Sequence, residues 1–524
     1  MAITKWFVGG ALAPNSFSRV RGERVVALQS RTVWIWVALT VCLAAAPRFW
    51  VFTRSVPWIT ADSFTYLNLA RVLRGEKVPS SYDPLALAPR DDQGARTPGY
   101  PMFLNLAFAL SGWQGTDEGV LWRITRDRKP LPIKLDPYHE RYLKRHENLR
   151  AVQLLQHLCG VLATLLAFGI LYHWTSSAPF ASLGSLVAIG LRPTWILIYE
   201  HDIITETLAA TLVVAFFWFV AQAQRGRNWL RLGVSSVVGS VLALVRPNYA
   251  FAVPLLFVYW SLRERRNLFA NPKLAISILL PFCILVGGWI TRNGIKFGTW
   301  NLTTWVGIVS YHFQAHPEVF NDPILRQEIN PQDYRAIAHS IGRLMSKWKV
   351  AFPEANRRLV AETKSAIIRH PEIFLRSVLE SLGTYYGSFV RASPRWGNLR
   401  WVLFFALLAI AVAGFISPFC KDAPPLTRFS LAFIIANSLV AAVFIDKYDQ
   451  GRIAFPTESL LTLQAFWLVW KVWEMWRNRR TSSKMNPSKT FKKLSKWSLR
   501  RCSKTVNLFP KNLQGMLRCF QKSI

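Results

Sequence analysis

The sequence predicts an all-α polytopic membrane protein, and three observations carry this prediction. The chain has 524 residues, of which 51% are hydrophobic and only 18% are charged. The apolar residues gather in runs of about 20, the length at which a helix crosses a bilayer. The excess of 64 Lys and Arg over 29 Asp and Glu gives a formal charge of +35, and much of it falls in short stretches between these runs. This composition excludes a disordered chain, a disulfide scaffold and an ordinary cytosolic enzyme.

Ten apolar segments are expected to span the membrane, namely 32–52, 151–172, 179–198, 203–222, 230–248, 249–262, 273–291, 400–417, 429–445 and 453–474. The tail 475–524 has 14 Lys or Arg and no Asp or Glu. With ten spans, the N-terminus, the basic turns near Arg225 and Arg263, and this tail share one side, which is cytoplasmic by the positive-inside rule. Residues 371–390 are apolar enough for an eleventh span, but that span would place the tail outside. We therefore predict an interfacial helix there.

Three regions follow from these spans. Residues 1–31 form a cytoplasmic N-terminal segment, and 32–474 form the membrane domain, with large outside loops at 53–150 and 292–399. Outside loops of this length usually carry function in a polytopic protein. The third region, the tail 475–524, is expected to rest on anionic membrane lipids. Nucleic acid is not expected as a partner, because the tail has no motif of interleaved basic and aromatic residues.

An acid, Asp62, follows the first predicted span shortly after its end. The residues behind it, from Ser63 to Leu73, have helical spacing of apolar side chains. Asp62 is therefore either the N-cap of an interfacial helix or a functional acid beside the membrane. Taken alone, the pattern favours the cap.

The segment 96–101 reads Arg-Thr-Pro-Gly-Tyr-Pro and leads into an apolar run. Its prolines and glycine predict a turn. Arg96 stands at the start of this turn, outside and close to the lipid headgroups, where a cation suits a phosphate. Taken alone, this segment is an ordinary turn.

Three acids and a histidine fall within the seven residues 200–206, at an outside junction between two predicted spans. Acids are costly in lipid and usually mark a site. Asp202 and Glu206 are four residues apart and share a helical face. The alternative is a solvated turn with a helix cap.

Three arginines stand at outside ends of predicted spans, against the positive-inside trend: Arg246, Arg292 and Arg452. An anionic ligand is one reason for cations on that side. For any single arginine, the alternative is a side chain that snorkels toward the lipid headgroups.

These motifs occur in a family-like order: Asp62, Arg-x-Pro-Gly-Tyr-Pro at 96–101, Thr-Glu at 205–206, Arg-Pro at 246–247, Arg-Asn-x-x-x-Phe-Gly at 292–298 and Tyr-x-x-x-Arg-x-x-x-Pro at 448–456. Over residues 32–470 this order resembles the GT-C glycosyltransferases, especially bacterial relatives of the protein mannosyltransferases (glycosyltransferase family 39) and of the aminoarabinose transferases. The chain departs from the pattern in two places. Residues 113–147 look inserted, and Ser63 follows Asp62 where the family often has a second acid.

The resemblance implies a GT-C-type fold with about 10 transmembrane helices. It also implies transfer of a sugar from a polyprenyl phosphate to the hydroxyl of a glycan, lipid or protein acceptor, with inversion. Asp62 would be the general base. Glu206 would be the second catalytic residue and would shape the donor or acceptor site. The implied substrate-binding residues are Arg96, Tyr100, Asp202, Arg246, Arg292 and Arg452. A divalent metal such as Mg or Mn is compatible with this scheme but not required, and no metal ligand is assigned.

Two alternatives of other classes remain at this point. A transporter or flippase for a lipid-linked or anionic substrate would show charged or broken helices at mid-membrane and an internal repeat. A non-catalytic membrane subunit would tolerate loss of Asp62 and Glu206. In the glycosyltransferase interpretation the site faces the extracytoplasmic side. A bacterial cytoplasmic membrane is preferred, although an endoplasmic reticulum fits as well.

Overall fold

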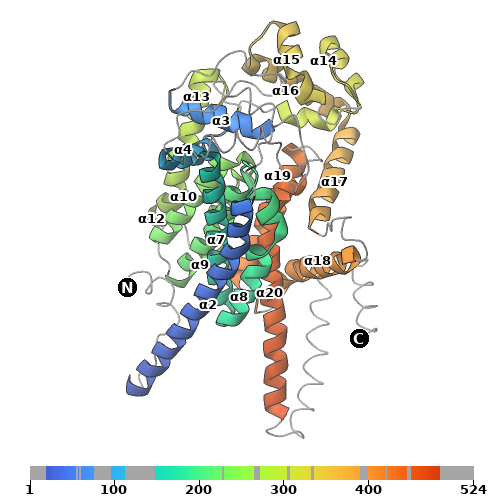
Figure 1. Cartoon of the computed structure of the whole chain (residues 1–524). Helices are drawn as coiled ribbons and strands as arrows, with labels where there is room; N and C mark the ends of the chain where they lie inside the picture. The colour runs from blue at the N-terminus through green and yellow to red at the C-terminus, as the bar shows by residue number, and fades with distance from the viewer. Residues whose placement is uncertain are drawn as a thin grey trace, which may run out of the picture. The chain divides into compact units, whose positions relative to one another are not determined.

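The computed structural model of the chain describes residues 19–54, 57, 61–75, 96–111, 148–226, 229–264, 272–303, 307–331, 336–389, 399–420, 422–444 and 450–483. Within these ranges the regular elements are helices, and no strand is found among them (Figure 1). The helices of the membrane part are α2 (Arg19–Arg54), α7 (Asn148–Thr175), α8 (Ala178–Ser185), α9 (Glu206–Gly226), α10 (Trp229–Val245), α11 (Ala252–Glu264), α12 (Pro272–Phe282), α13 (Gly288–Phe297), α18 (Leu399–Ile416), α19 (Pro425–Phe444) and α20 (Gln450–Ser483). The two predicted outside loops contain α3 (Ala61–Leu73), α4 (Gly99–Ser111), α14 (Pro323–Glu328), α15 (Ala336–Trp348), α16 (Phe352–Arg369) and α17 (Pro371–Ser388).

Several helices have the length and composition of membrane spans. Five are long and apolar enough to cross a bilayer: Arg31–Arg54, Leu149–Thr175, Glu206–Gln224, Pro272–Phe297 and Pro425–Phe444. Three shorter apolar helices are Ala178–Gly190, Trp229–Val245 and Phe405–Phe419. The eight overlap eight of the ten predicted spans. The predicted fold class, an all-α polytopic membrane protein, is confirmed.

Small residues let the central helices pack closely. Helix α7 packs against α2, α8 and α9, while α10 packs against α9 and α12. A Cβ atom added at Gly239 of α10 would lie 2.9 Å from Val253 and 3.1 Å from Phe216. Ser236 of the same helix donates a hydrogen bond to the carbonyl of Ile278. Helices in lipid gain no hydrophobic driving force when they associate. Glycine and serine positions such as these stabilise the packing through close backbone approach and hydrogen bonds.

The third predicted span, 179–198, is not one continuous helix. After α8 the chain forms a π-helical segment over Leu186–Gly190, a turn, and a second π-helical segment over Trp195–Tyr199. Pro193 stands in the turn, where its missing N–H and its ring oppose a regular α-helix. The boundary between the predicted spans 230–248 and 249–262 also differs from the prediction, because the first of the two helices ends before residue 248. Helix α10 ends at Val245, and Pro247–Tyr249 form a 3₁₀ turn.

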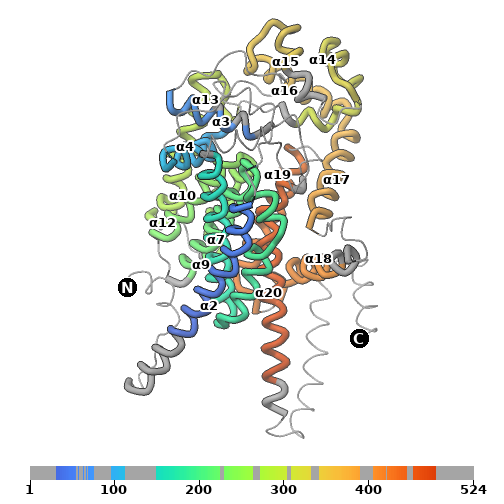
Figure 2. The backbone as a smooth tube through the Cα atoms, viewed as in Figure 1, coloured from blue at the N-terminus to red at the C-terminus, as the bar shows by residue number. Residues whose placement is uncertain are grey.

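The second outside loop builds a small core of its own. Helices α14, α15 and α16 enclose buried side chains that include Phe313, Phe320, Leu344, Trp348, Phe352 and Leu359. Helix α17 occupies the stretch predicted as an interfacial helix and packs along α19 (Figure 2). Tyr385 of α17 is 2.8 Å from the hydroxyl of Thr457, and Tyr386 is 2.7 Å from that of Ser438. These contacts tie the outer helices to the ends of α19 and α20.

Internal contacts divide the chain into two units, residues 1–467 and 468–524. All side chains discussed below belong to the first unit. Three predicted features fall outside the described residues, namely residues 1–18 of the N-terminal segment, the whole insert at 113–147 and the tail beyond Ser483.

Candidate active site

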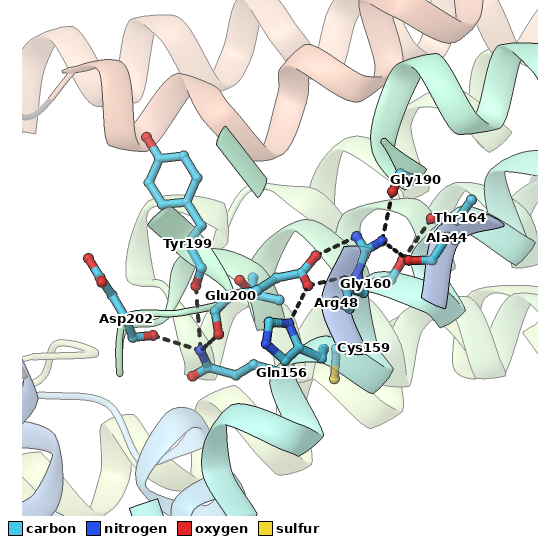
Figure 3. A network of polar contacts seen from close by, with 12 residues as sticks. Ala44, Arg48, Gln156, Cys159, Gly160, Thr164, Gly190, Tyr199, Glu200 and Asp202 are labelled. Carbon is cyan, nitrogen blue, oxygen red and sulfur yellow. Dashed lines mark hydrogen bonds and ion pairs between the residues drawn. The ribbon is translucent and has the colours of Figure 1, made fainter. Parts of the chain in front are cut away.

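The junction 199–206, between the interrupted third span and α9, is held in place by one glutamine. The Gln156 amide nitrogen of α7 donates to the carbonyl oxygens of Glu200 at 3.0 Å and Asp202 at 2.6 Å (Figure 3). The Tyr100 hydroxyl donates to the Gln156 amide oxygen at 2.6 Å. Burial, together with the carboxyls of Glu206 and Asp202, holds the pKa of Tyr100 well above its usual value, so the phenol keeps the proton that it donates. Tyr100 therefore acts on the junction through Gln156.

Glu206, the first residue of α9, binds two arginines from distant parts of the sequence. Its Oε1 atom accepts from Arg246 Nη2 at 2.9 Å and from Arg452 Nε at 2.6 Å. Arg246 also donates through Nε to the hydroxyl of Thr205 at 2.9 Å. The outer ends of α9, α10 and α20 thus meet at one carboxylate.

The two arginines of this cluster differ in solvent exposure. The side chain of Glu206 is fully buried and that of Arg246 is 9% exposed, whereas that of Arg452 is 29% exposed. Arg452 is therefore the more accessible guanidinium group of the cluster. Guanidinium groups bind phosphate with two parallel hydrogen bonds. The geometry therefore suits an anionic group presented beside Arg452.

Helix α3 begins next to the same junction. The hydroxyl of Ser63, buried in the first turn of α3, donates to the carbonyl oxygen of Ile203 at 2.7 Å. Asp62 precedes Ser63 in this turn, and its side chain lies outside the described residues. Because α3 begins at Ala61, Asp62 is the second residue of the helix and not its N-cap. Its backbone adjoins the contact between Ser63 and Ile203 of the junction.

Helix α4 brings the predicted turn at 96–101 against the end of α10. The Arg96 guanidinium lies over the ring of Tyr66 with its carbon 5.0 Å from the ring centre. Tyr66 in turn packs edge-on against Tyr100, with ring centres 5.1 Å apart. A Cβ atom at Gly99 would lie 2.6 Å from the backbone of Leu244. Only glycine allows this approach, which sets Tyr100 and Arg96 beside the end of α10.

Replacing Gly99 with alanine is expected to lower the free energy of unfolding by about 1–3 kcal/mol, because the new methyl group meets rigid backbone. Thermal unfolding of the purified protein in lipid nanodiscs measures this loss. The control is Gly383→Ala in α17, where an added Cβ atom meets nothing within 4 Å. Alanine there should be neutral or stabilising. Equal melting temperatures for the two variants would contradict the close approach of α4 and α10.

A second buried ion pair braces the junction from the other side (Figure 3). Arg48 of α2 binds both carboxylate oxygens of Glu200, through Nε at 2.7 Å and Nη2 at 2.5 Å. The Nη1 atom donates to the carbonyls of Ala44 and Gly190 at 2.7 and 2.8 Å. His157 Nδ1 lies 2.8 Å from Glu200 Oε2. These contacts join α2, α7 and the π-helical segment to the junction.

Arg292 is engaged with neighbouring aromatic rings. Its guanidinium carbon lies 4.3 Å from the ring centre of Trp289 and 5.2 Å from that of Phe297. It also donates to the side chain of Asn293 at 2.8 Å. The structure thus brings together Glu206, Arg246 and Arg452, joins Tyr100 to Asp202 through Gln156, and gives Arg292 a separate set of contacts.

Asp202 is close to a histidine but not hydrogen-bonded to it. Its Oδ1 atom lies 3.6 Å from His201 Nδ1, and its side chain is 13% exposed. Burial raises the pKa of Asp202 above its ordinary value, against the opposing effect of His201. The described residues contain no group of three or more His, Cys, Asp or Glu that could hold a metal ion. A metal therefore has no proposed ligand set in this part of the chain.

Sequence reasoning missed several polar residues that shape the site: Arg48, Gln156, His157, Arg192 and Glu458. Arg192 and Glu458 form an ion pair with side chains 18% and 9% exposed. All five lie inside predicted spans. A polar or ionisable residue within an apolar run is the signal that could have found them, because such residues are retained for function or pairing.

No protein-family model matches the chain, and no curated protein matches it. Among solved structures, ArnT from Cupriavidus metallidurans bound to undecaprenyl phosphate is similar, with 14% identity, 82% of this chain and 77% of that chain covered, and a TM-score of 0.35. The archaeal oligosaccharyltransferase AglB from Archaeoglobus fulgidus, in complex with an inhibitory peptide and a dolichol-phosphate, has 12% identity and a TM-score of 0.42. That match covers 87% of this chain and 52% of AglB.

Proposed function

We propose that the chain is a membrane glycosyltransferase that moves a sugar from a polyprenyl phosphate to an acceptor hydroxyl. The observation that carries this proposal is the cluster of Glu206, Arg246 and Arg452 beside the first turn of α3. In this arrangement, arginines that can bind an anion lie near the helix turn that contains Asp62. The GT-C-like order of motifs supports the same assignment.

The reaction would proceed in one displacement. Asp62 takes the proton of the acceptor hydroxyl, and the oxygen attacks the anomeric carbon of the donor from the face opposite the phosphate. The bond between that carbon and the phosphate oxygen breaks, so the configuration inverts and the lipid phosphate leaves. General-base help of this kind contributes about 10²–10⁴-fold.

The arginines would stabilise the leaving phosphate, where negative charge grows in the transition state. Arg452, the more exposed of the two, is assigned direct contact with the phosphate, and Arg246 supports it. Glu206 is fully buried, and both arginines bind one of its oxygens. We therefore assign Glu206 to positioning the two guanidinium groups. Arg96, Asp202 and Arg292 are proposed to contact other parts of the substrates.

Arg452→Ala is expected to weaken donor binding more than folding, because this side chain is partly exposed and the buried Glu206 keeps its pair with Arg246. Loss of a charge-assisted hydrogen bond costs about 1.5–3 kcal/mol, or roughly ten- to a hundredfold in affinity. Titration of purified protein in nanodiscs with polyprenyl phosphate and its sugar-bearing forms measures the change.

Arg343→Ala is the matched control for that titration. Arg343 is 58% exposed, lies in the second outside loop and pairs with Glu328 through the same Nε atom. Its removal should leave lipid affinity unchanged. If Arg452→Ala and Arg343→Ala bind the lipids as tightly as the unmodified chain, the phosphate site proposed at Arg452 is wrong.

A transporter or flippase is the second candidate, and one observation favours it. The third predicted span is interrupted by π-helical segments, and Arg192 in the interruption pairs with Glu458 of α20. Broken helices with buried charge are typical of transporters. Proteoliposomes containing a fluorescent polyprenyl-phosphate sugar and no acceptor decide between the two. A flippase would move the lipid between leaflets, whereas a transferase would not.

We also propose that the reaction takes place on the extracytoplasmic side of a bacterial cytoplasmic membrane. The basic residues of the short turns favour this orientation by the positive-inside rule. The acceptor is then a glycan, lipid or protein hydroxyl on that side. Membrane lipids surround the apolar helices, which include Arg31–Arg54 and Pro272–Phe297.

A further inference from the structure

Half of the buried polar side-chain atoms without a hydrogen-bond partner in the described residues come from two adjoining segments. Of fourteen such atoms, the seven are Gln153 Oε1 and Nε2, His157 Nε2, His201 Nδ1 and Nε2, Asp202 Oδ1 and Thr207 Oγ1. Two of them, His201 Nδ1 and Asp202 Oδ1, lie 3.6 Å from each other, beyond hydrogen-bond distance. Gln153, His157, His201 and Thr207 are at most 3% exposed. The first two belong to α7, and the others belong to the junction and the start of α9.

Hydrogen bonds hold these two segments together. Gln153 and His157 are four residues apart and share a face of α7. His157 binds the Glu200 carboxylate at 2.8 Å, and the neighbouring Gln156 binds the Asp202 carbonyl at 2.6 Å (Figure 3). Deeper in the bundle, Thr211 donates to the carbonyl of Cys159 at 3.2 Å. This bond sets α9 against α7, with Thr207 one turn nearer the junction.

Leaving so many polar atoms unsatisfied is costly. Each buried donor or acceptor without a partner costs about 1–3 kcal/mol, and native proteins leave few of them. Their occurrence on two segments that contact each other therefore indicates a ligand or water that completes their hydrogen bonds.

The chemistry of the atoms selects the kind of ligand. An amide, two imidazoles, a hydroxyl and a carboxylate offer both donors and acceptors, and a sugar hydroxyl can use either. The Glu200 carboxylate is already paired with Arg48, so the remaining atoms offer no fixed cation to a phosphate. They suit a neutral group that is rich in hydroxyls.

We infer that the outer end of α7 and the junction 200–207 form the binding site for the sugar of the donor, with Gln153 as a hydrogen-bonding residue. This inference rests on the proposed function. The donor would then contact the protein at two sites, with its phosphate at Arg452 and its sugar at the buried polar atoms without partners. Asp202 and Glu206, four residues apart, connect them.

Gln153→Leu tests the inference, because leucine has a similar size and removes both unpartnered amide atoms. The probes are undecaprenyl phosphate and the same lipid carrying glucose, mannose, galactose or N-acetylglucosamine. In the unmodified chain at least one sugar-bearing lipid should bind more tightly than the bare lipid. Gln153→Leu should lower the affinity for that sugar-bearing lipid about tenfold, as expected for two lost hydrogen bonds. Affinity for the bare lipid and the melting temperature should not fall.

The matched control is Gln222→Leu on α9, a buried glutamine whose amide nitrogen is also unpartnered. It should change the affinity of neither lipid. Three results would overturn the inference. One is no preference for any sugar-bearing lipid in the unmodified chain while the bare lipid binds, which would leave the phosphate site standing. The second is unchanged binding of both lipids to Gln153→Leu, which would mean ordered water only. The third is no binding of either lipid, which would remove the proposed function too.

Discussion

Asp62→Asn is expected to lower turnover by about two to four orders of magnitude while the protein still expresses, inserts and melts normally. Asparagine keeps the size of aspartate and caps a helix about as well. It cannot take a proton from the acceptor hydroxyl. The substitution therefore separates a general base from a residue that only stabilises the first turn of α3, where Asp62 is the second residue.

The assay for Asp62 is transfer of sugar from a polyprenyl-phosphate sugar by the purified variant. Ser63→Ala is a useful companion, because it removes the hydrogen bond from Ser63 to Ile203 that fixes the first turn of α3. It should reduce turnover and also stability, whereas Asp62→Asn should reduce turnover alone. A stable Asp62→Asn protein with normal turnover would mean that Asp62 takes no part in proton transfer, as a non-catalytic subunit also predicts.

Arg48→Met is expected to cause the largest loss of stability. The Arg48 and Glu200 side chains are 2% and 0% exposed. Removing one partner of a buried ion pair costs about 3–5 kcal/mol, because the other charge stays buried without compensation. The junction would also lose its brace, so donor transfer should fall together with stability. Chemical unfolding in detergent micelles measures the free energy.

The control for the buried pair is Arg376→Ala. Arg376 pairs with Glu380 on α17, and these side chains are 84% and 44% exposed. Exposed pairs contribute about 0–1 kcal/mol, so this variant should unfold almost as the unmodified chain does. If Arg48→Met unfolds no more easily than Arg376→Ala, the Arg48–Glu200 pair does not hold the junction.

The helical class and most spans could be predicted from the sequence, because apolar runs of bilayer length leave few alternatives to a helix. The third span was predicted as a continuous helix and was wrong in detail. Its apolar composition gives no sign of the π-helical segments around Pro193. The ends of α10 and α11 were also displaced, since a 3₁₀ turn at Pro247–Tyr249 separates them.

Individual site residues were predicted from the sequence, but the contacts between them were not. Glu206, Arg246 and Arg452 were each chosen from local patterns, and the structure joins them through two ion pairs. Their pairing spans 40 and 246 positions of sequence, which local patterns cannot show. Arg48 and His157 were missed because single polar residues inside apolar runs were treated as part of the spans.

The central claim is tested most directly by turnover in a defined membrane. The purified chain is placed in liposomes with a polyprenyl-phosphate sugar, identified beforehand as the one that accumulates in cells lacking the protein, and with an acceptor from those cells. We expect release of the bare polyprenyl phosphate in step with a glycosylated acceptor whose new linkage has inverted configuration. Normal lipid-linked sugars in the deletion cells, together with no release of polyprenyl phosphate in the liposomes, would contradict it.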